Sequence, residues 1–315
     1  MNRVPVITGV TATGKTDFVK NLHFLAEQSK LAKKIEIINA DAFQVYRYMN
    51  IGTAKPPENI LRKIPHHLID ILYPDEDYSA GKFFKFAENI ISDIYKRGNL
   101  PIVVGGTGMY IEILIKGIFD GPAKSEELRF KYSDIMEKYG LDKLYEMLKA
   151  NDPEYASKVS PNDKNRIIRA LEVCELTGMT FNQCHRKFHR NPAYRYDVYV
   201  FTGDRKKIYE KINSRVDKMF DNGWIDEVKR LLDMGYNPHL DSFDAIGYRQ
   251  VVSFLKGERT YEDIVREIKK KTRNFAKRQL TWFRHMKDIK YIKYIDVFDK
   301  DIVTDLREKL LYRLS

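Results

Sequence analysis

Short apolar runs alternate with longer amphipathic segments along the first 117 residues of the chain. The apolar runs are VPVITG (4–9), KIEIINAD (34–41), HHLIDIL (66–72) and LPIVVGG (100–106). Helix-like segments lie between them, at 16–30 and 79–98. Strands that alternate with helices predict a parallel α/β sheet, and continuous apolar strands predict that helices cover both faces of it.

The pattern changes after Gly117. Residues 119–193 show helical periodicity and no clear strand, and a strand then returns at YDVYVFTGD (196–204). Beyond residue 204 the chain has mainly helical periodicity, with one strand candidate at IKYIDV (292–297). The pattern predicts an α/β core formed by residues 1–118 and 194–315, with a mostly parallel sheet flanked by helices. A helical insertion domain would occupy 119–193.

Composition adds a basic charge balance. The 315 residues carry a net charge of +11, which is typical of proteins that meet a polyanion. No apolar run approaches the ~18 residues that span a bilayer, and no signal-peptide pattern opens the chain, so we expect a cytoplasmic protein without membrane contact. A zinc site built from Cys174, Cys184, His185 and His189 is disfavoured because their spacing contains no CxxC pair.

The stretch GVTATGKT matches the phosphate-loop pattern GxxxxGK[ST], between a predicted strand and a predicted helix. Its residues are Gly9, Val10, Thr11, Ala12, Thr13, Gly14, Lys15 and Thr16. Backbone N–H groups of such a P-loop surround phosphate oxygens, Lys15 adds a charge, and the Thr16 hydroxyl can bind Mg²⁺. Nucleotide hydrolysis, kinase chemistry and diphosphate displacement all remain open.

Two polar residues follow the ends of other predicted strands. Asp41 ends the second strand, where a carboxylate could bind metal, act as a general base or remain a solvated turn residue. Thr107 follows the fourth strand, at a position where many ATPases carry an acidic residue. This difference disfavours a motor ATPase and leaves transfer chemistry open.

Seven motifs in order give the chain a family resemblance over most of its length. They are GVTATGKT, NADAFQVYRYMNIGTAKP, PHHLID, VVGGTGMY, PNDKNRIIRALEVCELTG, DAIGYRQ and KRQLTWFR. The chain resembles the tRNA dimethylallyltransferases, also called tRNA isopentenyltransferases, of bacterial type. The resemblance implies transfer of a dimethylallyl group from dimethylallyl diphosphate to the exocyclic amine of the adenine 3′-adjacent to the anticodon in tRNA. Diphosphate would leave, and the P-loop would hold it with Mg²⁺.

The resemblance also assigns roles around the acceptor base. Asp41 matches the catalytic aspartate that accepts the amine proton, Thr107 matches a residue near that amine, and Gln44 matches a glutamine that contacts the target nucleotide. The intervening Ala42 and Phe43 belong to the same tRNA-contacting stretch. Since the base is normally stacked in the anticodon loop, it must be flipped out to react.

Three positions depart from the family's usual residues. Val10 replaces Pro, Thr13 replaces Ser, and Ala42 replaces a Ser after the catalytic Asp. The first two leave the P-loop backbone able to surround phosphate. The third removes one hydroxyl beside the base, so a substrate contact there is expected to differ.

The basic charge gathers in one predicted helix. Residues 266–290 hold ten Lys or Arg against two acidic residues, a net of +8. One stripe would present Arg273, Lys277 and Arg284, and another would pack Phe275, Gln279, Trp282 and Met286 on the core. A solvated amphipathic helix is the alternative, but the match to KRQLTWFR favours tRNA contact.

The family's tRNA-contacting segments map onto four places. They are Arg129; Asn165, Arg166, Ile167, Ile168 and Arg169; Asp244, Ala245, Ile246, Gly247, Tyr248 and Arg249; and Lys277, Arg278, Gln279, Leu280, Thr281, Trp282, Phe283 and Arg284. For Arg166 and Arg169 a structural ion-pair role is the alternative. The expected partners are a tRNA anticodon stem-loop and dimethylallyl diphosphate, bound by a monomer. Rival activities are adenylate isopentenyltransferase, a P-loop kinase or NTPase, and non-catalytic RNA binding.

Overall fold

The computed structural model describes residues 3–286 and 291–314. The chain divides into two compact units. Unit 1 comprises Met1–Ile115 and Ala193–Ser315, and unit 2 comprises Lys116–Pro192. Among the described residues, none of the helices combines the length and the apolar character that crossing a bilayer takes.

Unit 1 is built on a six-stranded sheet in which every pairing is parallel. The strand order is β3 (His66–His67), β2 (Ile35–Asn39), β4 (Leu100–Val104), β1 (Arg3–Gly9), β7 (Arg195–Thr202) and β8 (Ile292–Asp296). Residues of β2 and β4 are buried throughout, because helices cover both faces of the sheet. The predicted α/β fold with a mostly parallel sheet is therefore confirmed.

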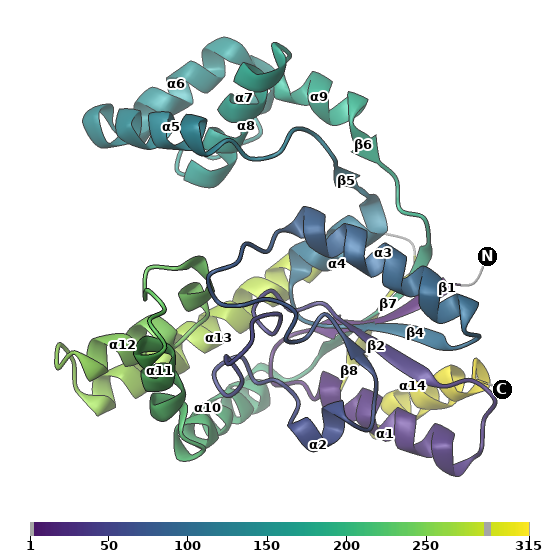
Figure 1. Ribbon diagram of the computed structural model, residues 1–315. Helices are drawn as coiled ribbons and strands as arrows, with labels where there is room; N and C mark the ends of the chain where they lie inside the picture. The colour runs from purple at the N-terminus through teal and green to yellow at the C-terminus, as the bar shows by residue number, and fades with distance from the viewer. Residues whose placement is uncertain (1–2, 287–290, 315) are drawn as a thin grey trace. The chain divides into compact units, whose positions relative to one another are not determined.

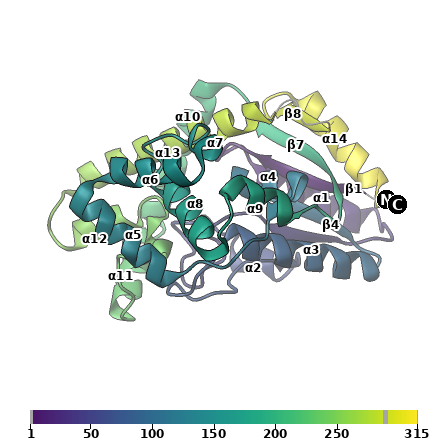
Figure 2. The same cartoon turned by 90° about the horizontal axis from the view of Figure 1, so that it is seen from above.

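Helices enclose the sheet from above and below (Figure 1). One face is covered by α1 (Lys15–Gln28) and α14 (Lys300–Tyr312), which bury Leu22, Leu306 and Leu310 in a common core with the sheet. The other is covered by α3 (Ala80–Lys96) and α4 (Gly108–Lys116), where the rings of Phe83 and Tyr110 stack 4.2 Å apart. Seen from above, α14 follows the edge strand β8 (Figure 2).

A second core in unit 1 joins the C-terminal helices to the loop after β2. The helices are α10 (Arg205–Asp221), α11 (Trp224–Asp233), α12 (Tyr248–Leu255) and α13 (Tyr261–His285), with a 3-10 turn at Asp241–Asp244. The short α2 (Glu58–Leu61) instead packs Ile60 against the core shared by α1 and α14. Trp224 and Tyr248 are almost fully buried in the second core, together with Met49 of the loop. The polar loop 41–57 is thereby held against helices from far along the sequence.

The predicted strand at HHLIDIL is wrong for most of its length. Only His66 and His67 pair with β2. Leu68 and Asp70 then adopt positive φ angles of 64° and 54°, which take the chain out of the sheet. The Asn39 side chain donates to the Leu68 carbonyl at 3.2 Å, so a side chain takes over where the strand pairing ends.

Unit 2 consists of five helices and one short pair of antiparallel strands. The helices are α5 (Glu126–Tyr139), α6 (Leu141–Asn151), α7 (Pro153–Ala156), α8 (Lys164–Thr177) and α9 (Phe181–Lys187). They bury Tyr132, Leu144 and Ile167 in a core of their own. The expectation of no strand in this segment is wrong, because β5 (Ile118–Phe119) and β6 (His189–Arg190) pair antiparallel.

Candidate active site

Three loops meet at the carboxyl edge of the sheet, because the strands that precede them, β2, β4 and β1, are neighbours. The Thr8 hydroxyl donates to the Gly105 carbonyl at 2.8 Å and ties β1 to β4. The Thr107 N–H donates to the Ala40 carbonyl at 3.3 Å and ties the loop after β4 to the loop after β2. The P-loop, Asp41 and Thr107 therefore occupy one place.

Two glycines permit this close approach. A Cβ on Gly9, whose φ is +120°, would lie 2.1 Å from the Phe201 carbonyl oxygen. A Cβ on Gly105 would lie 2.1 Å from the Ala40 carbonyl oxygen. Both clashes are with backbone, which cannot rotate away. A side chain at Gly105 would push the loops after β4 and β2 apart, and one at Gly9 would push the start of the P-loop away from β7.

Side chains of the P-loop hold its backbone in place through hydrogen bonds to its own carbonyls. Lys15 Nζ donates to the carbonyls of Gly9 at 3.1 Å and Val10 at 2.8 Å, and the Thr13 hydroxyl donates to the Val10 carbonyl at 2.7 Å. Gly14 then begins α1 in a left-handed conformation. Thr13 thus serves the loop in place of the usual Ser, and the Val10 side chain packs in an apolar cluster with α10 and α13.

A second cation stands beside Lys15. Arg215 of α10 donates from Nη1 to the Thr11 hydroxyl at 3.3 Å. Burial, reinforced by the positive charge of Arg215, lowers the pKa of Lys15 to about 7, and Asp41 opposes that change. Burial also lowers the pKa of Arg215. Two desolvated cations next to backbone N–H groups form a strong site for an anion with several charges.

Asp41 is held by one of its two oxygens. Oδ1 accepts the N–H groups of Phe43 at 2.9 Å and Gln44 at 3.2 Å. None of the hydrogen bonds within residues 3–286 and 291–314 uses Oδ2, so this oxygen can accept a proton. Burial raises the pKa of Asp41, against the two backbone donors and the charges of Lys15 and Arg215. A fixed carboxylate with a raised pKa is suited to general-base work.

The Thr107 hydroxyl is oriented by the same turn. Its Oγ1 accepts the Ala42 N–H at 3.1 Å, so its own proton remains available to a ligand. This bond uses the backbone of Ala42, and it is unaffected by the missing serine hydroxyl at that position. Asp41 and Thr107 therefore offer one acceptor and one donor at the ends of adjacent strands.

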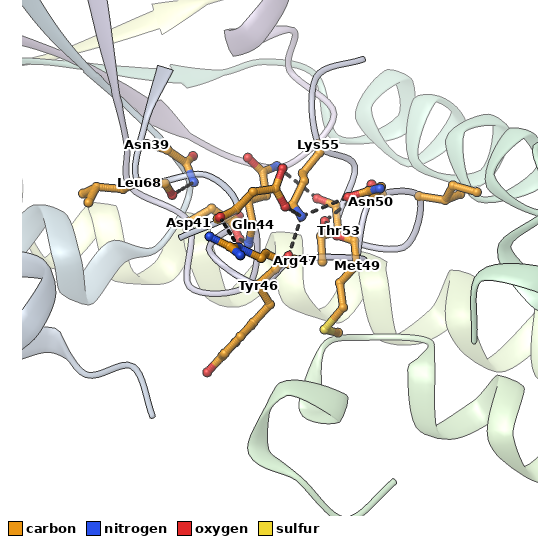
Figure 3. A network of polar contacts seen from close by, with 12 residues as sticks. Asn39, Asp41, Gln44, Tyr46, Arg47, Met49, Asn50, Thr53, Lys55 and Leu68 are labelled. Atoms are coloured by element: carbon orange, nitrogen blue, oxygen red, sulfur yellow. Dashed lines mark hydrogen bonds and ion pairs between the residues drawn. The ribbon is translucent and has the colours of Figure 1, made fainter. Parts of the chain in front are cut away.

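The loop after Asp41 is fixed by polar contacts (Figure 3). Gln44 Nε2 donates to the carbonyls of Thr53 at 3.0 Å and Ala54 at 3.2 Å. Lys55 pairs with Asp70 and also donates to Asn50 Oδ1 at 3.0 Å. Since the Gln44 nitrogen is occupied by backbone carbonyls, its Oε1 is the atom left for the predicted contact with a nucleotide.

Glu227 of α11 holds the far side of that loop. Its buried carboxylate accepts three consecutive backbone N–H groups, those of Asn50, Ile51 and Gly52, at 2.8, 2.7 and 3.1 Å. It also accepts the Tyr248 hydroxyl at 2.7 Å. Four donors satisfy this carboxylate, which makes its burial tolerable and fixes the loop backbone.

The loops and helices enclose a cavity of about 940 Å³. Its polar wall contains Thr11, Ala12, Gly14, Lys15, Thr16, Asp41, Gln44, Thr107 and Arg215. Its apolar wall contains Phe43, Val216, Met219, Trp224, Ile246, Phe275 and Trp282. A cavity lined both by cations and by aromatic and aliphatic side chains is suited to a ligand with an anionic head and an apolar or aromatic body.

The oxygen atoms at the start of α1 could supply a few of the ligands of a magnesium ion, with phosphate oxygens and water as the others. The exposed Thr16 and Asp17 line the cavity with Asp41, and hydroxyl and carboxylate oxygens are the ligands that Mg²⁺ prefers. Within the described residues, no three His, Cys, Asp or Glu side chains are grouped so as to hold a metal by themselves. These residues therefore suit an ion that also uses water and phosphate oxygens.

Comparison with known proteins gives this site its context. The model of the IPP transferase family matches residues 44–286. A tRNA dimethylallyltransferase 2 of Syntrophus aciditrophicus is 45% identical, covering 92% of each chain, and a tRNA dimethylallyltransferase of a Thermoanaerobacter species is 42% identical over 99% of this chain and 98% of its own.

This chain belongs to the IPP transferase family.

Solved structures agree with that assignment. The full-length tRNA isopentenylpyrophosphate transferase of Bacillus halodurans matches with a TM-score of 0.68 at 35% identity, covering 100% of this chain and 97% of its own. A eukaryotic dimethylallyltransferase acting on tRNA matches with a TM-score of 0.77 at 28% identity, covering 96% of this chain and 75% of its own. The family resemblance in the sequence is confirmed.

Helix α13, which carries the KRQLTWFR motif, divides into an exposed side and a packed side. Lys277, Arg278, Thr281 and Arg284 are exposed, as a nucleic-acid contact requires. Arg273 of the predicted stripe is half-buried, and its Nη1 donates to Asn213 Oδ1 on α10 at 2.7 Å. The last residues of the predicted basic segment, 287–290, lie outside the described residues.

Several residues assigned to tRNA contact have buried side chains. Gln279 and Phe283 of α13, Ala245 and Tyr248 near α12, and Ile167 and Ile168 of α8 are at most 6% exposed. Gly247 is buried as well, and Leu280 packs beside the cluster that contains Val10. These side chains pack inside the protein, because each lies on the inner face of its helix or turn. The exposed neighbours, such as Asn165 and Arg249, are accessible from the surface, whereas Ala245 and Gln279 line the cavity.

The arginines of unit 2 are engaged with acidic partners. Arg169 donates from Nη1 to the buried Glu172 at 2.6 Å and from Nη2 to the Pro122 carbonyl at 2.6 Å. Arg129 lies 3.4 Å from the same carboxylate, and Arg166 lies 3.4 Å from Asp163. The structural ion-pair alternative thus holds for Arg169. The more exposed Arg129 and Arg166 keep donors for a ligand.

Arg215 and Glu227 are site residues that the sequence analysis missed. Arg215 reaches Thr11 from 204 positions away, and Glu227 reaches Asn50 from 177 positions away. Neither belongs to a motif with a chemical meaning of its own. The one local signal is a charged residue at a position of the amphipathic pattern that should be buried, as Glu227 is in IDEVKRLL.

Proposed function

We propose that this protein transfers a dimethylallyl group from dimethylallyl diphosphate to the exocyclic amine of the adenine 3′-adjacent to the anticodon in tRNA, releasing diphosphate. The observation that carries the proposal is the convergence of the P-loop, Asp41 and Thr107 on one cavity with both a cationic and an apolar wall. The relatives named tRNA dimethylallyltransferase, which align over nearly the whole chain, support it.

The cationic wall would hold the donor's diphosphate. Departure of diphosphate from an allylic carbon builds negative charge on the leaving oxygen, and the P-loop amides, Lys15 and Arg215 are placed to stabilise it. A bound Mg²⁺, held at Thr16 and the diphosphate oxygens, would neutralise further charge on that leaving group. The apolar wall would receive the dimethylallyl chain and keep water from the allylic carbon.

Asp41 and Thr107 would act on the acceptor. The adenine amine is a poor nucleophile, and it becomes one as its proton moves to Asp41 Oδ2. The Thr107 hydroxyl, held by the Ala42 N–H, would orient the base through a hydrogen bond, and Gln44 would contact it through Oε1. The base must leave the anticodon stack to reach these atoms, and aromatic residues of the cavity wall can stack on it.

The exposed cations of α13 would contact the RNA backbone. Lys277, Arg278 and Arg284 provide the charge that phosphates require, whereas a free nucleotide needs no such surface. This difference favours a tRNA acceptor over an adenylate acceptor. We also propose that the protein acts as a monomer in the cytoplasm.

A transfer assay tests the proposal directly. Protein, Mg²⁺ and labelled dimethylallyl diphosphate are mixed with an anticodon stem-loop or with AMP. We expect label in the RNA with the unaltered protein. The Asp41→Asn variant is the negative control, in which we expect no labelled RNA. Label in AMP alone would assign the protein to the adenylate isopentenyltransferases. Label in neither acceptor, together with brisk ATP hydrolysis, would assign it to the P-loop NTPases.

A further inference from the structure

A buried glutamine of α13 joins two of the loops that form the site. Gln279 is 5% exposed, and its side-chain amide lies between the P-loop and the loop after β4. Its Oε1 accepts the Thr11 N–H at 2.8 Å, and its Nε2 donates to the Gly106 carbonyl at 2.8 Å. One amide thus satisfies a donor of the P-loop and an acceptor next to Thr107.

The amide stands where strand pairing ends. Within the sheet, β1 and β4 are neighbours, and the Gly105 N–H donates to the Ile7 carbonyl at 3.2 Å as the last backbone bond between them. Beyond that bond the two chains separate toward their loops. Gln279 continues the connection, since its amide has the same acceptor and donor as a peptide group.

The surroundings are shaped for this amide. A Cβ on Gly106 would lie 2.5 Å from Gln279 Nε2, so only glycine leaves room for the bond. Trp282, one turn further along α13, packs so closely on Gly108 that a Cβ there would lie 2.6 Å from its ring. Helix α13 therefore supports Thr107 from both sides, through Gly106 and Gly108.

We propose that Gln279 is a positioning residue that fixes the P-loop and Thr107 relative to each other. It does so from the helix that exposes Lys277 on another side, so one helix would contact RNA on that side and align the reacting groups on the side of Gln279. The inference rests on the proposed function for its kinetic readout. A displacement of ~1 Å between a leaving-group site and an acceptor site can cost about 100-fold in rate.

The first variant removes both hydrogen bonds at nearly constant volume. Gln279→Met is expected to lower kcat about 10- to 100-fold, because the Thr11 N–H and the Gly106 carbonyl lose their shared partner. Affinity for the anticodon stem-loop should stay within about twofold, since the exposed face of α13 is unchanged. Affinity for inorganic diphosphate with Mg²⁺ should fall several-fold, because the P-loop is no longer fixed.

The second variant gives a signature that a purely structural role would not give. Gln279→Glu keeps the acceptor for the Thr11 N–H but places a carboxylate against the Gly106 carbonyl. Protonation of that carboxyl restores a donor beside an acceptor. The kcat of this variant relative to the unaltered protein should therefore rise as pH falls from 8 to 6.

Gln250 provides the matched control. It is also a buried glutamine with one accepted and one donated bond, from the Gly247 N–H and to Glu267, and it lies outside the cavity. Gln250→Met should lower the melting temperature about as much as Gln279→Met, with kcat at saturating tRNA unchanged. An equal loss of kcat in the two Met variants would overturn the positioning role. So would a ratio of the kcat of Gln279→Glu to that of the unaltered protein that does not change between pH 8 and pH 6.

Failure of the proposed function would be seen separately. If the unaltered protein transfers no label, the activity assignment is wrong, whereas diphosphate binding still tests Gln279. Unchanged diphosphate affinity in Gln279→Met would then reject the inference by itself.

Discussion

Affinity for the diphosphate donor should weaken as the pH rises above 7, because Lys15 is expected to lose its proton there. Burial lowers the pKa of this lysine to about 7, with Arg215 adding to the effect and Asp41 opposing it. A diphosphate in the P-loop favours the charged lysine and raises its pKa again. Donor binding above pH 7 must therefore take up a proton, and it weakens as protons become scarce.

The size of the effect follows from the pKa. At a pKa of about 7, roughly half of the Lys15 side chains are protonated at pH 7 and about 1% at pH 9. If the bound state stays protonated, the association constant falls about 50-fold over this range, or about 2.3 kcal/mol. The donor's terminal phosphate titrates near pH 6, so the slope is clearest above pH 8.

Titration calorimetry measures both the affinity and the proton. Dimethylallyl diphosphate is titrated at fixed Mg²⁺ at pH 8 in two buffers with different ionisation enthalpies. The difference between the two observed binding enthalpies should correspond to uptake of about one proton. The variant Lys15→Arg, which stays charged, should show weaker binding without that uptake. Equal proton uptake in the variant and the unaltered protein, or none in either, would refute the titration of Lys15.

Three further predictions concern other parts of the molecule. Asp41→Asn should lower kcat by at least about 100-fold with tRNA affinity unchanged, as measured by single-turnover transfer and filter binding, and a parallel loss of affinity would remove Asp41 from the base role. Lys277→Ala should weaken tRNA binding and reduce the slope of log affinity against log salt by about 1, whereas Arg273→Ala, which loses an internal bond to Asn213, should lower stability instead. Glu36 is bonded by Arg97, Asn99 and His67, and these partners hold its pKa at about 2 in spite of burial. This group stabilises the fold above its unfolded pKa of 4.5 and loses that effect as the pH falls toward 2. Glu36→Gln should therefore cost about 2–3 kcal/mol in urea unfolding at pH 7 and little at pH 2, and an equal deficit at both pH values would contradict the ion-pair account.

Local signals in the sequence predicted the sheet and the centre of the site. The P-loop, Asp41 and Thr107 each follow a continuous apolar run, and the parallel sheet brings these strand ends together. The prediction of a strand along HHLIDIL was wrong because Leu68 adopts a left-handed backbone conformation, which the hydrophobic pattern does not reveal. Apolar pattern records which residues are buried, but it does not record where a strand leaves its neighbour.

The residues that complete the site could not be predicted in the same way. Arg215, Glu227 and Gln279 are polar side chains on helices, and each bonds to loop atoms at least 173 positions away. These atoms are the Thr11 hydroxyl for Arg215, the N–H groups of residues 50–52 for Glu227, and the Thr11 N–H and Gly106 carbonyl for Gln279. The helical pattern placed Arg273 and Lys277 on the same basic face. In the structure Lys277 is exposed, whereas Arg273 is half-buried and bonds to Asn213. Such differences depend on the tertiary fold, which periodicity along one helix does not contain.

The order of strands in the sheet has a consequence for synthesis. Strand β1 is made long before β7, one of its two neighbours, where Arg195 pairs with Arg3. All of unit 2 is made between them, and its helices bury a core of their own within the 77 residues Lys116–Pro192. We therefore expect the inserted helices to fold while β1 still lacks a partner along one edge. An apolar strand exposed for that long is prone to pair with other chains, so early protection of its edge should govern the yield of folded protein.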